Sequence, residues 1–276
     1  MLPALSAFAL PAILAFALAA PTAAPQPRIV SLIPSLTEDL FAIGAGAQVA
    51  AVSAYTDFPP AAAKLPVIGS FTSIDTEKIL ALHPDVVVGI SAQAPLVADL
   101  RRAGMKPALL DDDSYDDIFR DLATLGRLSG HEREATLLIA HLQARTSELV
   151  RTVPATRPRP SVFVVLGVAP LYTVGDRSYI AHLISLAGGR NAAGDLRDAY
   201  PRYGGEALVA LQPDIIVADR ESGLRDVLDR APWNALRAVR AKRVYVLDDA
   251  DLLERPGPRY VEGLAWLIAR LHPHGT

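Results

Sequence analysis

Aromatic residues recur in the segments that follow predicted β-strands of this 276-residue chain. They are Tyr55, Phe58, Phe71, Tyr172, Tyr200 and Tyr203. In a wound α/β sheet the ligand crevice lies outside the carboxyl ends of the strands. Rings on two such edges that face each other could grip a large flat or apolar ligand. The alternative is that each ring fills its own half of the molecule, and we favour that interpretation for Phe58, which precedes two prolines.

The sequence lacks the common motifs of catalysis. Gly44-Ala45-Gly46 follows a predicted helix and lacks the third glycine of a dinucleotide-binding turn. There is no phosphate-binding loop, no Gly-x-Ser-x-Gly turn and no His-Glu-x-x-His pair. The six histidines have no metal-ligand spacing, and the acidic run at 111–113 indicates helix capping rather than a calcium loop. We therefore expect a binding protein, with no catalytic residue and no protein-bound metal.

Composition narrows the partners and the compartment. A formal net charge of -3 argues against nucleic acid, and the absence of cysteine excludes disulfides, thiolate metal sites and a lipidated cysteine. Residues 1–24 are almost wholly apolar and small, and their three prolines and short apolar core favour a secretory signal and linker over a membrane anchor. We therefore expect a periplasmic protein without a lipid anchor.

Two segments of the chain, 74–88 and 203–217, repeat one another. They read IDTEKILALHPDVVV and YGGEALVALQPDIIV, and their shared Glu, Leu, Pro and Asp are each 129 positions apart. Each copy has a short apolar helical pattern, a proline that ends the helix, and a β-branched run typical of a strand covered on both faces. The repeat predicts two related α/β halves.

These elements predict two Rossmann-like α/β lobes with parallel-rich sheets. We place the N-terminal lobe at 25–130 and the C-terminal lobe at 156–276. Between them lies an interlobe segment, 131–155, in which residues 131–153 carry apolar side chains mostly three and four positions apart, as in a single long helix of ~33 Å. We expect this helix to be a rigid bridge between the lobes.

Several segments together carry a resemblance to a known family. They are RIVSLIPSLTE (28–38), SAYTDFPP (53–60), TEKILALHPD (76–85), YTVG (172–175), ALVALQPD (207–214) and ERPGPR (254–259). With them the chain resembles the periplasmic vitamin B12 (cobalamin)-binding proteins of ABC importers, in the group that also carries ferric siderophores and haem. The resemblance implies the helical-backbone fold of periplasmic binding proteins, and a corrinoid as transported ligand rather than cofactor.

The resemblance also implies a set of site residues. Carried over motif by motif, the ligand-binding residues are Tyr55, Phe71, Tyr172, Tyr200 and, near the cleft, Arg255. Phe71 and Tyr200 stand where the family commonly has tryptophan, and Tyr172 where it has phenylalanine. Glu77 and Glu206, one in each lobe, correspond to the glutamates that meet the ABC permease subunits.

The resemblance leaves alternatives to a corrinoid carrier open. A haem or ferric-siderophore carrier of the same transporter group is one, and a tetrapyrrole-handling enzyme is another. Haem would ask for an axial Tyr or His in the cleft, and an anionic siderophore would ask for several arginines. We expect the protein to be a monomer when no permease is bound.

Overall fold

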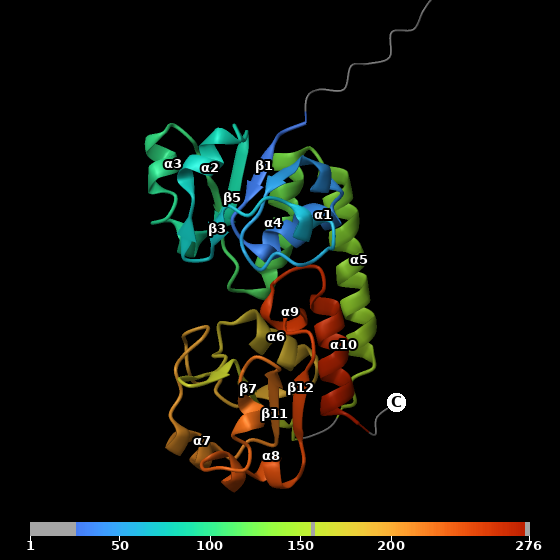
Figure 1. The fold of residues 1–276 in the computed structure, drawn as a ribbon. Coiled ribbons are helices and arrows are strands. Elements are labelled where there is room, and N and C mark those ends of the chain that lie inside the picture. Colours follow the sequence, from blue (N-terminus) through green and yellow to red (C-terminus); the bar gives the residue numbers. More distant parts are fainter. Residues whose placement is uncertain (1–25, 156–157, 274–276) are drawn as a thin grey trace, which may run out of the picture.

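The computed structural model describes residues 26–155 and 158–273, and it consists of two α/β lobes lying beside one long helix (Figure 1). We call residues 26–130 the N-lobe and residues 158–273 the C-lobe. The long helix is α5 (Glu132–Arg151), which packs against α4 of the N-lobe and α10 of the C-lobe. Among the described residues, no helix is long and apolar enough to cross a membrane.

Each lobe has a four-stranded parallel sheet with the same strand arrangement. The N-lobe elements are β1 (Ile29–Ser31), α1 (Pro34–Ala42), β2 (Val49–Ala51), β3 (Gly69–Ser70), β4 (Ser73–Ile74), α2 (Thr76–Ala81), β5 (Val86–Ile90), α3 (Ala98–Arg102), β6 (Ala108–Leu110) and α4 (Tyr115–Ser129). The C-lobe elements are β7 (Ser161–Val165), β8 (Gly167–Val168), β9 (Leu171–Tyr172), α6 (Tyr179–Leu186), β10 (Arg190–Asn191), α7 (Gly205–Leu211), β11 (Ile215–Asp219), α8 (Arg237–Arg240), β12 (Val244–Leu247), α9 (Asp251–Glu254) and α10 (Tyr260–Leu271). The sheet orders are β2-β1-β5-β6 and β10-β7-β11-β12. The predicted fold class is confirmed.

The sequence repeat folds as the same unit in both lobes. Its helices are α2 and α7, and its strands are β5 and β11. In the sheets, β5 lies between β1 and β6, and β11 lies between β7 and β12. The aspartate of each Pro-Asp pair accepts a hydrogen bond from the start of the neighbouring strand: Asp85 from the Arg28 amide at 2.7 Å, and Asp214 from the Ser161 amide at 2.8 Å. The repeated aspartate therefore fixes the register between two parallel strands.

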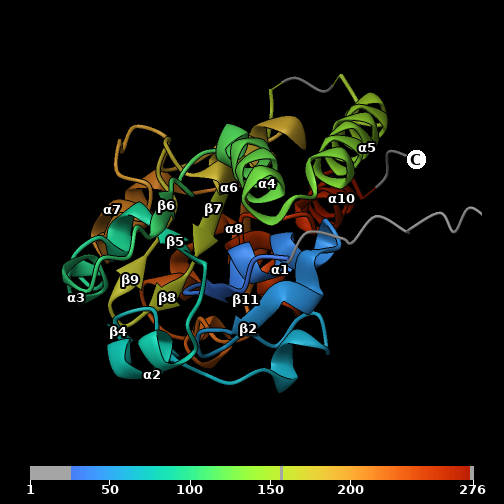
Figure 2. The same cartoon turned by 90° about the horizontal axis from the view of Figure 1, so that it is seen from above.

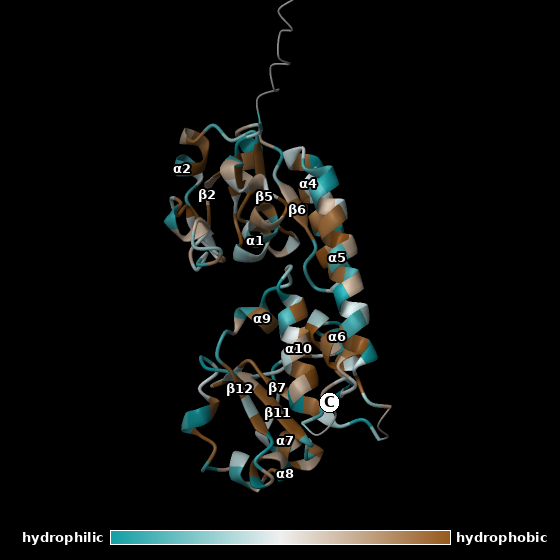
Figure 3. Ribbon diagram, turned by 90° about the vertical axis from the view of Figure 1, so that its right-hand side faces the viewer, coloured by the Kyte–Doolittle hydropathy of each residue, from teal (hydrophilic) through white to brown (hydrophobic). Residues whose placement is uncertain are grey.

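A continuous apolar core joins the lobes behind the sheets. The strands of both sheets are mostly hydrophobic, while α5 alternates hydrophobic and hydrophilic residues (Figure 3). Tyr260 of α10 is fully buried, and its hydroxyl lies 2.7 Å from Thr146 Oγ1 of α5 and 3.2 Å from the Tyr115 hydroxyl of α4. Tyr115 packs edge-on against Tyr260 and stacks on His182 of α6 at 4.5 Å. Elements of both lobes therefore share one aromatic cluster, which restricts their relative movement.

This cluster yields a stability prediction. Tyr260→Phe removes the hydroxyl that Thr146 and Tyr115 share, so it should lower the free energy of unfolding by about 1–2 kcal/mol. Urea denaturation followed by circular dichroism measures the change. Tyr245→Phe is the control, because the ring of Tyr245 is only half buried and its loss should stay below about 0.5 kcal/mol. Equal losses in the two variants would contradict the assignment.

Candidate ligand-binding cleft

A pocket of about 540 Å³ lies between the lobes. From the N-lobe it is lined by Tyr55, Asp57 and Phe58, and from the C-lobe by Glu221, Asp248, Asp249, Ala250, Asp251, Glu254, Arg255 and Arg259. The N-lobe residues follow β2, and the C-lobe residues follow β11 and β12. The pocket therefore lies outside the carboxyl ends of parallel strands, where α/β sheets bind ligands.

Tyr55 is the most exposed aromatic residue of the pocket lining. Its side chain is 84% exposed, and its backbone has a φ of 65°, in the left-handed region that side chains other than glycine rarely adopt. Large apolar rings are seldom left so exposed unless a ligand or partner covers them. The geometry presents the Tyr55 ring to the space between the lobes.

Phe58 was expected to fill the interior of the N-lobe, and it does not. Its ring is 40% exposed and lines the interlobe pocket, with the guanidinium of Arg259 centred 4.1 Å from it. A cation placed over a ring face is attracted by the ring quadrupole. Phe58 is thus held by a residue of the opposite lobe, and the two following prolines do not turn it inward.

Three other predicted aromatic residues, Phe71, Tyr172 and Tyr200, are exposed but do not line this pocket. Phe71 is 51% exposed in the turn between β3 and β4, which faces β8 and β9 across the space between the lobes (Figures 1 and 2). Tyr172 in β9 and Tyr200 are 37% and 42% exposed. Their segments lie side by side, because the Thr173 amide donates to the Pro201 carbonyl at 3.1 Å. Tyr203, by contrast, packs against Phe163 inside the C-lobe.

Arg255 is held by protein groups through four of its five guanidinium N–H groups. Its Nη1 donates to Glu38 at 2.9 Å and to Asp57 at 2.8 Å, its Nη2 donates to the Tyr55 carbonyl at 2.8 Å, and its Nε lies 2.8 Å from Asp251. Arg255 was predicted as a ligand-binding residue near the cleft. The structure places it at the cleft wall, with all three guanidinium nitrogens committed to the protein.

Glu38 of α1 is the buried centre of this network. Its side chain is 3% exposed, and Arg259 approaches it with two nitrogens, Nε at 2.9 Å and Nη2 at 3.1 Å. Arg259 also contacts Asp249 at 2.8 Å. The two arginines are therefore neutralised by carboxylates from both lobes. Sequence reasoning missed Glu38, because nothing local marks a helical glutamate as the partner of an arginine 217 positions away.

Acidic groups dominate the rest of the pocket. Six carboxylates line it against two arginines. Burial, together with a contact to Asp219, raises the pKa of Glu254 to about 8, and burial raises the pKa of Asp251 to about 6 despite the opposing charge of Arg255. Asp112 belongs to the acidic run at 111–113 of the N-lobe and does not line the pocket. Burial and the neighbouring Asp113 raise the pKa of Asp112 to about 6, so this run is not only a solvent-exposed helix cap.

Two further acidic residues, Asp39 of α1 and Asp121 of α4, are buried in the N-lobe. Asp39 has no solvent exposure, and neither of its carboxylate oxygens has a hydrogen-bond partner among the described residues. Burial and the charge of Asp121 raise the pKa of Asp39 well above its usual range, and burial and the charge of Asp117 raise the pKa of Asp121 to about 8. Protonation of these carboxyl groups removes the cost of burying their charge.

The buried pair gives a pH-dependent prediction. Because the folded-state pKa values are raised, the native state binds more protons than the unfolded state between about pH 4 and 8, and stability falls as pH rises through that window. Asp39→Asn should therefore raise the free energy of unfolding by about 1–3 kcal/mol at pH 8 and change it little at pH 4. Urea denaturation at both pH values tests this, and an equal effect at the two would contradict it.

Glu77 and Glu206 lie far from the pocket. Each is exposed in the first turn of its helix, α2 and α7 respectively. Figure 1 shows both helices on the same side of the molecule, across from α5, one in each lobe. Negative charge at these positions also suits the helix dipoles.

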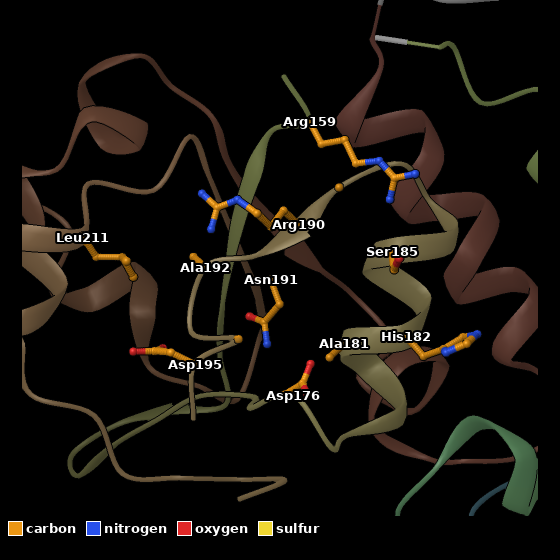
Figure 4. Close-up of a pocket in the computed structure, with 12 residues that line it drawn as sticks. Arg159, Asp176, Ala181, His182, Ser185, Arg190, Asn191, Ala192, Asp195 and Leu211 are labelled. Carbon is orange, nitrogen blue, oxygen red and sulfur yellow. The ribbon is translucent and has the colours of Figure 1, made fainter. Parts of the chain in front are cut away.

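A larger hollow, of about 840 Å³, is confined to the C-lobe (Figure 4). Arg159, Asp176, His182, Arg190 and Asp195 are among the residues that line it, and none of the predicted site residues does. Its lining carries no aromatic side chain other than His182, which is stacked on Tyr115. The interlobe pocket therefore remains the better candidate, although it is smaller. Among the described residues, no group of three or more acidic or histidine side chains could hold a metal ion.

Two α/β lobes that enclose a pocket, with a long helix behind them, define a substrate-binding protein that captures its ligand between the lobes. The chain belongs to the periplasmic binding protein family, whose sequence pattern matches residues 29–250. It is 29% identical over 255 residues to the uncharacterized ABC transporter substrate-binding lipoprotein YvrC of Bacillus subtilis, covering 89% of this chain and 80% of that protein. It is 30% identical over 252 residues to the vitamin B12-binding protein of Photorhabdus laumondii, covering 90% and 89%.

A solved structure has the same fold, but its name refers to heme rather than to vitamin B12. The crystal structure of a periplasmic heme binding protein from Pseudomonas aeruginosa superimposes with a TM-score of 0.81 and 27% identity, covering 91% of this chain and 95% of that one. The chain is therefore a periplasmic binding protein, and its relatives include one named for vitamin B12 and one named for heme. Members of this group are substrate-binding proteins of transporters rather than enzymes.

Proposed function

We propose that the protein captures cobalamin or a closely related corrinoid in the interlobe cleft and delivers it to an ABC permease. The observation that carries the proposal is the character of the pocket: exposed Tyr55 and Phe58 rings beside a carboxylate lining whose arginines are paired. A corrinoid has apolar faces and a rim of neutral amides. Its faces can stack on the rings, and its amide N–H groups can donate to the carboxylates.

The same lining opposes anionic ligands. Haem carries two propionate groups, and ferric siderophores are commonly anionic, so either would bring negative charge toward the six carboxylates. Arg255 and Arg259 cannot compensate without leaving Glu38, which is 3% exposed. Because an unpaired buried charge is costly, we expect the arginines to stay with Glu38. The curated relative named for vitamin B12 supports the same choice.

Haem remains the second candidate because of one specific observation. Tyr55 is 84% exposed in the pocket, and a tyrosine hydroxyl is a known axial ligand of haem iron. No histidine lines the part of the pocket that the structure describes. A haem carrier would therefore depend on Tyr55, and its loaded form would have the visible spectrum of tyrosine-ligated iron.

Isothermal titration calorimetry with a charge series of ligands tests the proposal. Cyanocobalamin should bind. Its monocarboxylic acid, which carries one added negative charge, should bind about tenfold more weakly, and hemin should bind more weakly than that acid. The two corrinoids differ by a single amide-to-acid change, so shape is held constant. Glu221→Gln should reduce the penalty for the monocarboxylic acid, while Glu134→Gln on α5 should leave it unchanged. Tighter binding of hemin than of cyanocobalamin would replace the proposal with the haem alternative.

We propose that the permease contacts the lobes through Glu77 and Glu206. Their equivalent positions suit docking across a pair of permease subunits, since each lobe then offers the same charge. Because both lie far from the pocket, Glu77→Arg combined with Glu206→Arg should leave ligand affinity unchanged and abolish ligand uptake in cells that carry the transporter.

The matched control for docking is Glu132→Arg. Glu132 also occupies the first turn of a helix, α5, but this helix runs along the opposite side of the molecule (Figure 1). Uptake should therefore persist in that variant. A loss of ligand affinity in the Glu77/Glu206 double variant would show that these residues serve the ligand rather than the permease.

We also propose that residues 1–24, which lie outside the described residues, act as a secretory signal that leaves a periplasmic protein without a lipid anchor. The Bacillus subtilis relative is named as a lipoprotein. Lipid attachment of that kind requires a cysteine, and this sequence contains none. The proposed form is therefore a monomer that diffuses between ligand and permease.

A further inference from the structure

The Tyr55 loop, defined as residues 53–60 between β2 and the next short helix, is held by both lobes. Its own lobe holds the start of the loop, through the Ala54 amide and the Gly69 carbonyl at 2.7 Å. From Tyr55 onward the long-range polar contacts come from the C-lobe. Arg255 donates to the Tyr55 carbonyl at 2.8 Å and to Asp57 at 2.8 Å, and Arg259 lies over the Phe58 ring.

This loop needs external support. A non-glycine residue with a φ of 65° is destabilised relative to extended or helical backbone, and it persists when surrounding contacts hold it. The Tyr55 ring cannot supply those contacts, since it is 84% exposed. The charged hydrogen bond from Arg255 to the Tyr55 carbonyl acts directly on this residue, and charge-assisted bonds are stronger than neutral ones.

We propose that Arg255 is a positioning residue: it acts from the C-lobe to set the orientation of the Tyr55 ring, and so makes the grip on the ligand depend on the separation of the lobes. The proposal rests on the proposed function in one respect, that Tyr55 contacts the ligand. Glu38, Asp57, Asp251 and the Tyr55 carbonyl take four of the five N–H groups of Arg255, so we assign its main role to the loop rather than to the ligand.

The link to lobe separation follows from hydrogen-bond geometry. A bond of 2.8 Å weakens steeply once the donor and acceptor are more than about 3.2 Å apart. Arg255 follows α9 in the C-lobe, and Figure 1 shows α9 next to the N-lobe. A displacement of the lobes by ~1–2 Å would break the bond to Tyr55 and release its ring. A permease that draws the lobes apart would thereby loosen the ligand without touching it.

The test compares Arg255→Ala, Tyr55→Ala and the double variant. Arg255→Ala should fold, because Arg259 still pairs with Glu38 through two nitrogens. Asp57→Ala is a second variant that leaves Glu38 untouched, since the Asp57 side chain is 68% exposed and, within residues 26–155 and 158–273, forms its ion pair with Arg255 alone. Arg145→Ala is the control, because Arg145 forms an exposed ion pair on α5.

Two readouts separate positioning from other roles. Hydrogen exchange of the Ala54 amide, which donates to the Gly69 carbonyl at the start of the loop, should be about tenfold faster in unliganded Arg255→Ala, several-fold faster in Asp57→Ala and unchanged in Arg145→Ala. The Kd for cyanocobalamin should rise about tenfold in Arg255→Ala and in Tyr55→Ala, and no further in the double variant, because both changes remove the same ring contact.

Two outcomes would overturn the inference. Unchanged exchange in the loop would show that Arg255 does not hold it, and losses of affinity that multiply in the double variant would show that Arg255 contacts the ligand directly. If the wild-type protein binds no corrinoid, the proposed function fails, while the exchange measurement still decides whether Arg255 positions the loop.

Discussion

The cleft depends on the pairing of one buried carboxylate, Glu38, with two arginines of the opposite lobe. A carboxylate that is 3% exposed is tolerated only when cations and hydrogen-bond donors surround it. Arg255 and Arg259 satisfy this need and leave one positive charge over, and Asp57, Asp249 and Asp251 contact the same two arginines at the cleft surface. The buried pairing therefore accounts for the acidic residues that touch the two arginines, and the pocket wall carries further carboxyl groups beyond them.

This pairing also explains how far the lobes are coupled. The ion pairs at the cleft and the Tyr115–Tyr260–Thr146 cluster in the core are two contacts between lobes in addition to α5. A molecule joined at several points closes over a ligand with small movements, so less binding energy is spent on ordering the site. We expect a largely preformed cleft whose loops, rather than whole lobes, adjust to the ligand.

Local sequence patterns predicted the fold because local physics determines it. The repeated Pro-Asp pairs marked the helix ends and strand starts, and the structure adds why aspartate recurs: Asp85 and Asp214 each bind the first residues of the neighbouring strand. The exposed rings could be predicted from their places after strands. The Glu38–Arg255 contact could not, because its partners are 217 positions apart in the sequence and each reads alone as a charge at a helix end. Phe58 was assigned inward for the same reason: its partner, Arg259, lies in the other lobe.

Charge, more than shape, should decide between the tetrapyrroles of this transporter group. Aromatic rings stack on any large π-system or apolar face, so Tyr55 and Phe58 distinguish poorly between a corrin and a porphyrin. The rims of these ligands differ more, since the corrin of cobalamin carries amides and the porphyrin of haem carries carboxylates. Asp251, with a pKa raised to about 6, is mostly ionised at pH 7 and can accept amide N–H groups, whereas Glu254, with a pKa raised to about 8, is mostly protonated and can donate to an amide carbonyl. Under the proposed function, the groups at the edge of the ligand would therefore decide which ligand this cleft binds.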